Sequence, residues 1–490
     1  MSDPFDRTRR LIARLGGGEA AIATMASLRV ELFMPEPTPA DEIALALAAT
    51  LLLRLDRAAP TLSIRTPATR QRSIPLLGDG RIVDEIATAH EGFASVERLT
   101  ADPFSDPDLR VVFGAADLPG LSVRSSGWSA VLGIGVQSCP AGNALGASLA
   151  GVLSSIEVLK AAFLKAHIAT GLVRPWSGSV SLWSYDARIN TGPVIDAPLD
   201  LDDTAIIGAG GIGSPLGWVL SLLDRTGAPT VIDKDVVDST SLNRHLTAGF
   251  AEVGQSKAAL LATLLESDQC SPKVRQSRWQ ALPESERSPR VAIVTVDNDP
   301  TRRDVQLDMP RWVLNAGTSD DGLYRVSRHD FLTGACTCCL SHADERSAGL
   351  LDSIASRLGL DPGALEPYLH RPDPLPAEIL DKADLDQADR LALAAVPGTA
   401  LAETVCATVQ AKPEDPAVSA PMLSAAPAVL LAADLARLHM EPAGFSASDT
   451  STSIFTGPHR AWTRTRSKRT GCPCTNAFYT GHYRRKWVTA

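Results

Sequence analysis

The chain has 490 residues, more than one compact core usually holds, so its length favours two or three domains. Its formal net charge of −9 disfavours binding to nucleic acid or to an anionic membrane surface. The eight cysteines occur in a sequence whose first residues lack the apolar core of a signal peptide. We therefore expect a cytoplasmic protein whose cysteines bind metal or act in catalysis rather than form disulfide bonds.

The first third of the chain, residues 1–175, predicts a mixed α/β domain. Helical apolar spacing runs through residues 41–59, and short buried strands are expected at 109–116 and 128–136. A long apolar helix is expected over residues 142–167. The segment carries no phosphate-binding glycine pattern, and "RPWSGS" marks its predicted end.

From about residue 200 the sequence alternates strand, glycine turn, helix and strand. "TAIIGAG" and "PTVIDKD" are expected strands, with a helix over 212–227 between them. The order predicts an α/β fold with a doubly wound, mostly parallel Rossmann-like sheet. Residues 176–343 would form its first part and 418–490 its last, and 344–417 would be a separate helical segment.

The glycine turn predicts a phosphate site. Gly208-x-Gly210-x-x-Gly213 lies where an expected buried strand turns into a helix, so that backbone N–H groups can face a phosphate. Asp233 ends the next strand, where a carboxylate meets ribose hydroxyls. These residues alone do not distinguish NAD from ATP.

The residues after Asp233 favour ATP. Asn243, Arg244 and Lys257 follow it in order, and cations of this kind neutralise charge that builds on phosphates as a carboxylate attacks the α-phosphorus. A dehydrogenase has no need of them, because its pyrophosphate is already held by the glycine turn. Each residue alone has a plain structural role available, but the ordered set favours phosphate chemistry.

The stretch "GAGGIGS…VIDKDVVDSTSLNRH…VGQSKA…TVDND", from Thr204 to Asp299, resembles the adenylation domain shared by ubiquitin-activating enzymes and bacterial sulfur-carrier adenylyltransferases, the ThiF/MoeB type. The resemblance implies ATP and Mg²⁺ as ligands, with Arg244, Lys257 and Asp297 acting in catalysis and Asp297 holding the magnesium. His245 stands where many members have Gln. The nucleotide contacts that the resemblance implies are Gly208, Gly210, Gly211, Gly213, Asp233, Asp235, Asn243, Arg244, Lys257, Asp297 and Asn298.

Two close cysteine pairs predict a structural zinc site. Cys336-x-x-Cys339 and Cys472-x-Cys474 supply four thiolates, the number that tetrahedral Zn²⁺ requires. The family has two Cys-x-x-Cys pairs, so the shortened second pair leaves open whether Cys338 replaces a neighbour.

Cys406 is the candidate nucleophile. It lies between the first cysteine pair and the apolar helix at 420–441, the interval in which thioester-forming relatives of the family carry their catalytic cysteine. Its apolar neighbours Val405 and Val409 would suit a core cysteine equally well.

Members of the resembled family act as dimers, or as one chain with an active and an inactive half. Residues 1–175 would then be the inactive half of an internal pseudo-dimer, with the helices at 142–165 and 420–440 near the shared interface. The sequence leaves open whether two chains also form a homodimer. Arg7, Arg9 and Arg10 are candidates to reach the nucleotide from that half, although three arginines on one helix also suit a solvated face.

The sequence therefore predicts an activating enzyme for a ubiquitin-like protein, one that passes the acyl group to Cys406 and then to a conjugating-enzyme partner. Its size is closer to bacterial ubiquitin-like conjugation systems, some linked to antiviral defence, than to the large eukaryotic enzymes. The alternatives are a sulfur-carrier or peptide adenylyltransferase that stops at the acyl-adenylate, a non-catalytic scaffold, and an NAD-dependent oxidoreductase.

Overall fold

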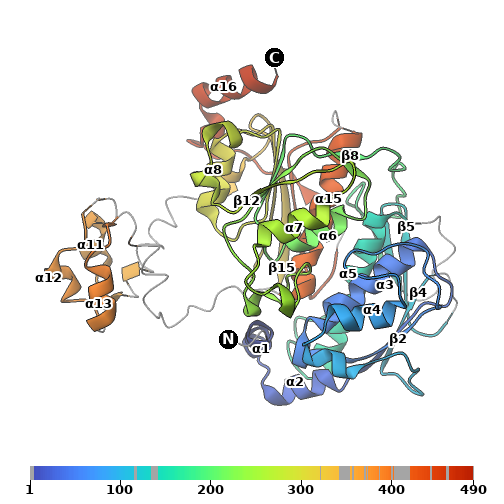
Figure 1. Ribbon diagram of the computed structural model, residues 1–490. Helices are drawn as coiled ribbons and strands as arrows, with labels where there is room; N and C mark the ends of the chain where they lie inside the picture. Colours follow the sequence, from blue (N-terminus) through green and yellow to red (C-terminus); the bar gives the residue numbers. More distant parts are fainter. Residues whose placement is uncertain are drawn as a thin grey trace. The chain divides into compact units, whose positions relative to one another are not determined.

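The computed structural model divides into two compact units, Met1–Cys339 with Val418–Ala490 and Leu340–Ala417, each described by itself below (Figure 1). The residues that the structure describes are 5–114, 118–133, 142–319, 322–340, 354–355, 358–368, 371, 373–385, 387–398, 401, 420–441, 444–458 and 463–488.

The first half of the larger unit is built on a seven-stranded sheet in the order β3-β2-β1-β4-β5-β6-β7. Neighbours from β3 to β5 run parallel, and β6 and β7 are antiparallel additions. Thr38 begins α3, since its side chain accepts the Asp41 N–H and Pro39 occupies the first helical position. The elements are α1 (Asp6–Arg14), α2 (Glu19–Ala26), β1 (Arg29–Phe33), α3 (Pro39–Leu53), η1 (Asp56–Ala58), β2 (Thr61–Arg65), α4 (Ile82–Ala89), η2 (Ala94–Arg98), β3 (Leu99–Thr100), β4 (Leu109–Phe113), β5 (Leu121–Ser126), β6 (Ser129–Gly133), α5 (Ala144–Lys165) and β7 (Gly178–Ser181).

The second half is built on an eight-stranded sheet in the order β12-β11-β9-β13-β14-β15-β16-β17. Neighbours from β12 to β14 run parallel, and the last three strands are antiparallel. Its elements, with the short β8–β10 pair, are β8 (Leu199–Asp200), β9 (Thr204–Ile207), α6 (Gly213–Leu220), β10 (Arg225–Thr226), β11 (Thr230–Ile232), η3 (Ser239–Ser241), η4 (Phe250–Glu252), α7 (Lys257–Leu265), β12 (Lys273–Arg275), η5 (Trp279–Ala281), η6 (Glu284–Glu286), β13 (Val291–Val294), α8 (Asp299–Leu307), β14 (Trp312–Thr318), β15 (Leu323–His329), α9 (Thr337–Leu340), α15 (Pro421–Met440), β16 (Ser448–Ser453), β17 (Thr463–Arg464), η8 (Pro473–Thr475) and α16 (Ala477–Trp487).

The two sheets share one topology. In each half the first strand lies between the second and the fourth, the third strand lies at the edge, and antiparallel strands follow the fifth. A long apolar helix, α5 or α15, then precedes the seventh strand of its own half. The α/β, mostly parallel Rossmann-like fold expected from the sequence is therefore present twice.

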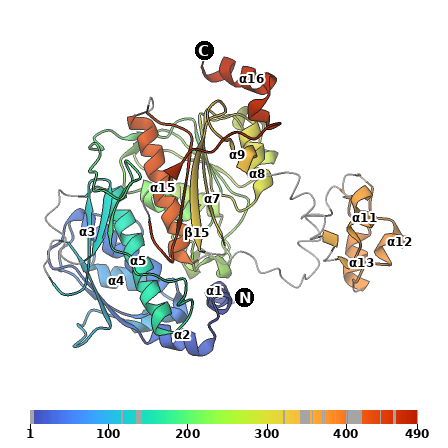
Figure 2. The ribbon, with the colours of Figure 1, turned by 180° about the vertical axis from the view of Figure 1, so that it is seen from behind.

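The helices α5 and α15 pack against each other and join the two halves into one hydrophobic core (Figure 2). Both helices are long and apolar enough to cross a membrane by length and composition alone. Their most apolar windows are nevertheless 89% and 94% buried inside the protein, as in core helices of a globular domain. The predicted proximity of these two helices is confirmed.

Two boundaries differ from those expected. The first sheet continues past residue 175, because β7 pairs with β6. The helix expected over 212–227 ends at Leu220, because Arg225 and Thr226 form β10, which pairs with β8 instead of continuing the helix.

The halves are connected by an exposed stretch and leave a cavity between them. Trp128 donates to the Thr191 and Pro193 carbonyls, and Val194 after them is 79% exposed, before β8 begins at Leu199. A cavity of about 650 Å³ lies between α3 and residues 88–92 of one half and Trp218 and residues 246–252 of the other.

The smaller unit has an apolar core of its own. Its described elements are α11 (Pro362–Leu365), η7 (Glu366–Tyr368), α12 (Ala377–Leu380) and α13 (Gln387–Leu393). The buried side chains include Leu358, Leu365, Leu380 and Leu393. Short helices packed around this core give the insertion a small, separate fold.

Candidate nucleotide site and metal centre

The glycine turn follows β9 and leads directly into α6. Gly208 has a φ of +98°, which side chains rarely tolerate. A Cβ atom on Gly213 would lie 2.1 Å from the Gly208 carbonyl oxygen, so the turn closes on itself only with glycine there. The N-terminus of α6 thus faces this turn, as a phosphate site requires.

Asp233 follows β11 and binds the glycine turn. Its carboxylate accepts hydrogen bonds from the Ala209 N–H at 2.6 Å and from the Asp235 N–H at 2.8 Å. Burial raises the pKa of Asp233, although these two hydrogen bonds and the charge of Lys257 act in the opposite direction. The predicted ribose carboxylate is therefore fixed beside the predicted phosphate turn.

Asn243 and Arg244 lie in a turn after η3 that returns to the glycines. Asn243 is buried, and its side-chain oxygen accepts from Arg244 Nη1 at 3.4 Å. The Arg244 side chain covers Gly211, since a Cβ on that glycine would lie 2.8 Å from Arg244 Cδ. Burial lowers the pKa of Arg244 to about 10, the charge of Arg7 lowers it too, and Asp238 and Asp297 oppose this shift.

Lys257 is the first residue of α7, where Ser256 caps the helix by accepting the Ala259 N–H. Its Nζ lies 3.8 Å from Asp235 Oδ2, and its side chain is 11% exposed. Asp235 in turn donates its backbone N–H to Asp233. The predicted residues from Gly208 to Lys257 thus form one connected set at the carboxyl ends of β9 and β11.

Asp297 comes three residues after β13, the strand that pairs with β9, and its side chain is exposed. The next residue, Asn298, begins α8, because its side chain accepts the Thr301 N–H at 3.0 Å. Asn298 therefore has a capping role, and its expected nucleotide contact stays a prediction. Asp297 itself does not cap α8.

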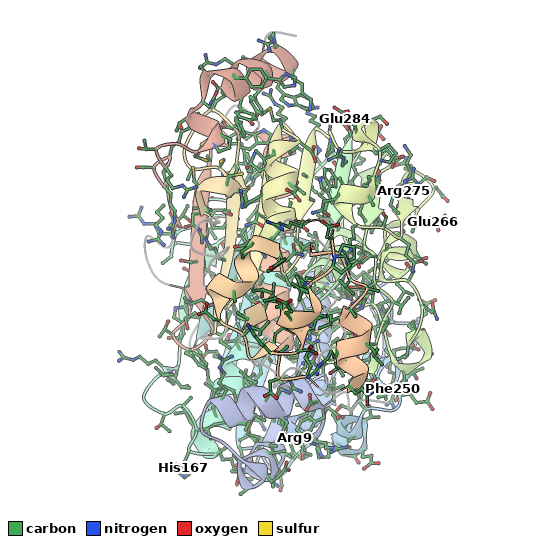
Figure 3. All side chains as sticks on the ribbon, turned by 90° about the vertical axis from the view of Figure 1, so that its left-hand side faces the viewer. Arg9, His167, Phe250, Glu266, Arg275 and Glu284 are labelled. Atoms are coloured by element: carbon green, nitrogen blue, oxygen red, sulfur yellow. The ribbon has the colours of Figure 1, made fainter. Side chains whose placement is uncertain are left out.

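Arg7 is the arginine of α1 that approaches this site from the other half. Its pKa is lowered by burial and by Arg10, and raised by the negative charges of Asp238 and Asp297. Arg9 and Arg10 instead pair with Glu19 at 3.6 Å and with Asp6 at 2.7 Å (Figure 3 labels Arg9). Of the three expected candidates, Arg7 is the one in electrostatic reach of Arg244 and Asp297.

His245 is buried beside the same turn. Its Nδ1 lies 3.2 Å from Thr247 Oγ1, and Thr247 also accepts from and donates to Ser214 in α6. Burial lowers the pKa of His245 to about 3, and the charge of Lys257 lowers it further. The residue that replaces the family's Gln is thus a neutral ring that supports the turn.

Three supporting residues were not anticipated. Thr295 donates to the Gly208 carbonyl at 2.6 Å, and Arg302 donates to the Val296 carbonyl at 2.6 Å and the Ala316 carbonyl at 2.9 Å. A threonine just after an apolar strand is a weak signal for such a contact. Arg302 and the third residue, Arg54, carry no local signal, because their partners lie on other elements or in the other half.

The two cysteine pairs meet in one cluster. Cys336 and Cys339 at α9 lie with Cys472 and Cys474 at η8, all four sulfurs within 4.8 Å of one another and buried. Sulfur–sulfur distances of 3.5, 3.5 and 3.9 Å match the about 3.8 Å that tetrahedral zinc with 2.3 Å bonds requires. Cys338 points to the Arg303 carbonyl, so it does not replace a neighbour. The cluster has the donor set and spacing to bind a metal.

Cys406 lies outside the described residues, so its position relative to the nucleotide site is not described. It belongs to the unit Leu340–Ala417, which is inserted between α9 and α15.

Residues 200–305 match the ThiF family. The chain contains a ThiF-family domain. The match covers β9 to α8 and includes the glycine turn, Asp233, Arg244, Lys257 and Asp297. The ThiF match therefore coincides with the candidate nucleotide site.

Two further similarities extend beyond the ThiF domain. The chain is 32% identical over 250 residues to the uncharacterized protein y4jF of Sinorhizobium fredii, an alignment that covers 49% of this chain and 47% of that protein. The chain thus spans about half the length of that relative. Crystal structures of E. coli MccB with AMPCPP and MccA, and with ATP, align at TM-scores of 0.36 and 0.35 and identities of 14% and 15%. Each alignment covers 72% of this chain and 96% of that one.

Proposed function

We propose that the protein uses ATP to activate the C-terminal carboxylate of a ubiquitin-like protein. An oxygen of that carboxylate attacks the α-phosphorus, the bond to the β-phosphate oxygen breaks, and pyrophosphate leaves. The product is an acyl-adenylate. One observation carries the proposal: Arg244 covers Gly211 of the glycine turn, Lys257 lies 3.8 Å from Asp235 beside the same turn, and the charges of Arg7 and Asp297 act on Arg244.

The positively charged side chains favour phosphate chemistry at this site. Arg244 and Lys257 lie where charge would build on phosphate oxygens during attack, and preorganised charge of this kind is usually the largest catalytic contribution. Their desolvation strengthens the effect, because a buried charge is less screened by water. An NAD-dependent oxidoreductase has no use for such a set, so ATP is the favoured nucleotide.

Asp297 is the residue that would hold Mg²⁺. Its carboxylate is exposed and lies beside the carboxyl end of β13, and Mg²⁺ is commonly bound by one or two carboxylates together with phosphate oxygens. When bound, the ion neutralises charge on the departing pyrophosphate. Arg302 keeps the chain before Asp297 in place by binding the Val296 carbonyl.

In the second proposed step, thioester formation, Cys406 is the nucleophile. Its thiolate would attack the acyl carbon, AMP would leave, and the thioester would pass to a conjugating-enzyme partner. The place of Cys406 in the sequence, between the first cysteine pair and the apolar helix at 420–441, supports this assignment. The alternative is an enzyme that stops at the acyl-adenylate, as a sulfur-carrier or peptide adenylyltransferase would.

We assign a structural Zn²⁺ to the four-cysteine cluster, and we place the protein in the cytoplasm, where free thiols persist. In this proposal the chain is an internal pseudo-dimer in which the first half has lost the nucleotide site.

The test begins with a search of the neighbouring genes for a small protein ending in Gly. Mixed with the protein, Mg²⁺ and ATP, it should support exchange of labelled pyrophosphate into ATP. A reductant-sensitive adduct between the two proteins should also form and should disappear in Cys406→Ala. Exchange without any adduct would leave the adenylate-only function; ATP binding without exchange, for every carrier tried, would favour the scaffold.

A further inference from the structure

Arg54 of the first half is bonded to the turn that carries the phosphate residues of the second half. It is the C-cap residue that follows α3, it is only 2% exposed, and its Nη1 donates to the Leu242 carbonyl. Nη2 donates to the Ala248 carbonyl at 2.9 Å and to the Leu246 carbonyl at 3.4 Å. One guanidinium therefore binds the chain on both sides of Asn243 and Arg244.

Contacts within its own half also define the shape of the turn: Ser214 in α6 accepts the Thr247 N–H at 2.8 Å, and Leu242, Leu246 and Ala248 are buried. Within it, Arg244 and His245 donate to the Ser241 carbonyl at 3.1 Å each, and Ala248 donates to the His245 carbonyl at 3.2 Å. Residues 246–252 also border the cavity between the halves, where close packing is absent. The hydrogen bonds from Arg54 thus add a directed constraint on the side of this segment that borders the cavity.

The environment of Arg54 fixes the guanidinium itself. Its Cζ lies 5.5 Å from the centre of the Phe93 ring, and Phe93 packs edge-on against Phe250 at 5.2 Å (Figure 3 labels Phe250). Burial lowers the pKa of Arg54 to about 9, and Glu252 opposes this shift. Burying a cation is costly unless it is hydrogen-bonded, and both Nη groups of Arg54 donate to carbonyls whose positions these hydrogen bonds fix.

We propose that Arg54 is a positioning residue through which the first half holds the Asn243–Arg244 turn in the conformation that binds nucleotide phosphates. The half without a glycine turn is then required for the chemistry of the other half. The inference rests on the proposed use of ATP, since Arg244 covers Gly211 and small displacements of such a group weaken phosphate contacts strongly.

The experiment compares Arg54→Met with Arg98→Met in the full-length protein. Arg98 makes the same kind of contact, donating to the Asp56, Arg57 and Ala59 carbonyls at 2.8, 3.2 and 3.3 Å, but all three belong to its own half. With Mg²⁺–ATP in calorimetric titration, Arg54→Met should weaken binding by about tenfold. Arg98→Met should stay within about twofold of the wild type.

A double-mutant cycle with Arg244→Ala distinguishes positioning from general destabilisation. If Arg54 acts through the turn, Arg54→Met should weaken ATP binding little more once Arg244 is gone, whereas additive effects would overturn the proposal. If Arg54→Met does not fold, Arg54→Lys with hydrogen exchange replaces it. Faster exchange at residues 241–248 with weaker ATP binding supports the role, and wild-type affinity overturns it.

The two levels of inference fail in different ways. If the wild-type protein binds no ATP, the proposed function is wrong, and the role of Arg54 toward phosphates falls with it. If the wild type binds ATP and Arg54→Met or Arg54→Lys binds it equally well, only the positioning role is wrong.

Discussion

Gly213 leaves no room for a side chain, and this gives a prediction at the scale of one residue. In Gly213→Ala the new methyl would meet the Gly208 carbonyl oxygen, a backbone atom that moves only with β9. We expect a loss of about 1–3 kcal/mol in the free energy of unfolding, together with weaker ATP binding. Urea unfolding and calorimetry measure the two effects.

Gly210 provides the matched control. No atom lies within 4 Å of a Cβ built there, and its φ is not in the left-handed region. Gly210→Ala should therefore unfold at the same urea concentration as the wild type. Equal stability of both alanine variants would contradict the close packing at Gly213.

Arg7 and Arg9 lie on one short helix but face different partners. Arg7→Ala should lower the rate of acyl-adenylate formation by about 10²-fold, because it removes a desolvated cation near Asp297 and Arg244. Arg9→Ala loses the exposed ion pair with Glu19 and the contact of its guanidinium with the Phe5 ring, and it should keep the wild-type rate. Pyrophosphate exchange measures both, and an unchanged rate in Arg7→Ala would exclude α1 from the site.

At the scale of elements, the cysteine cluster joins α9 to η8, which are far apart in the chain. We expect one zinc per chain, measured by a colorimetric chelator after denaturation. Cys474→Ser should lose most of the metal and unfold at lower temperature, because folding and metal binding are coupled. Cys338→Ser should keep both properties; loss of zinc from that variant would place Cys338 among the ligands.

The elements that the sequence could predict are those whose apolar pattern lies within the element itself. The strand before Gly208 and the helices at 144–165 and 421–440 follow from local apolar patterns. The local pattern after Gly213 predicts a helix longer than α6. The pattern does not show that Arg225 and Thr226 pair with β8, because that strand lies more than twenty residues earlier.

The same distinction holds within the candidate site. Asp233, Arg244 and Lys257 carry a motif spacing, so the sequence alone places them in order. Arg54 belongs to no such motif, because the carbonyl groups that it binds lie more than 180 residues further along the chain. The shortened Cys472-x-Cys474 pair left its geometry open until the turn at η8 brought both sulfurs to the cluster.

At the scale of the whole molecule, three buried histidines make stability depend on pH. Burial lowers the pKa of His90 and of His245 to about 3, and that of His329 to about 4, from an ordinary value of 6.5. Below pH 6.5 these histidines therefore bind protons in the unfolded chain but stay neutral in the folded protein. Stability is complete above that pH and falls below it, down to the lowered pKa of each histidine, by about 1.4 kcal/mol per pH unit for each.

Urea unfolding at pH 7.5, 6 and 5 measures this dependence. In His90→Gln the amide can still donate to the Ile86 carbonyl that Nδ1 contacts, but the side chain no longer titrates. The slope between pH 6 and 5 should then be smaller than in the wild type. An identical slope would mean that His90 is not kept neutral by the fold.

The exposed stretch after Pro193 has a consequence for how the two halves stay together. In a dimer of separate chains, the fraction assembled falls on dilution. Here a short connection before β8 keeps each half at an effective concentration of the order of millimolar next to its counterpart. Turnover per chain should accordingly not decline as the protein becomes scarce, because every copy carries the candidate nucleotide site together with its own partner half.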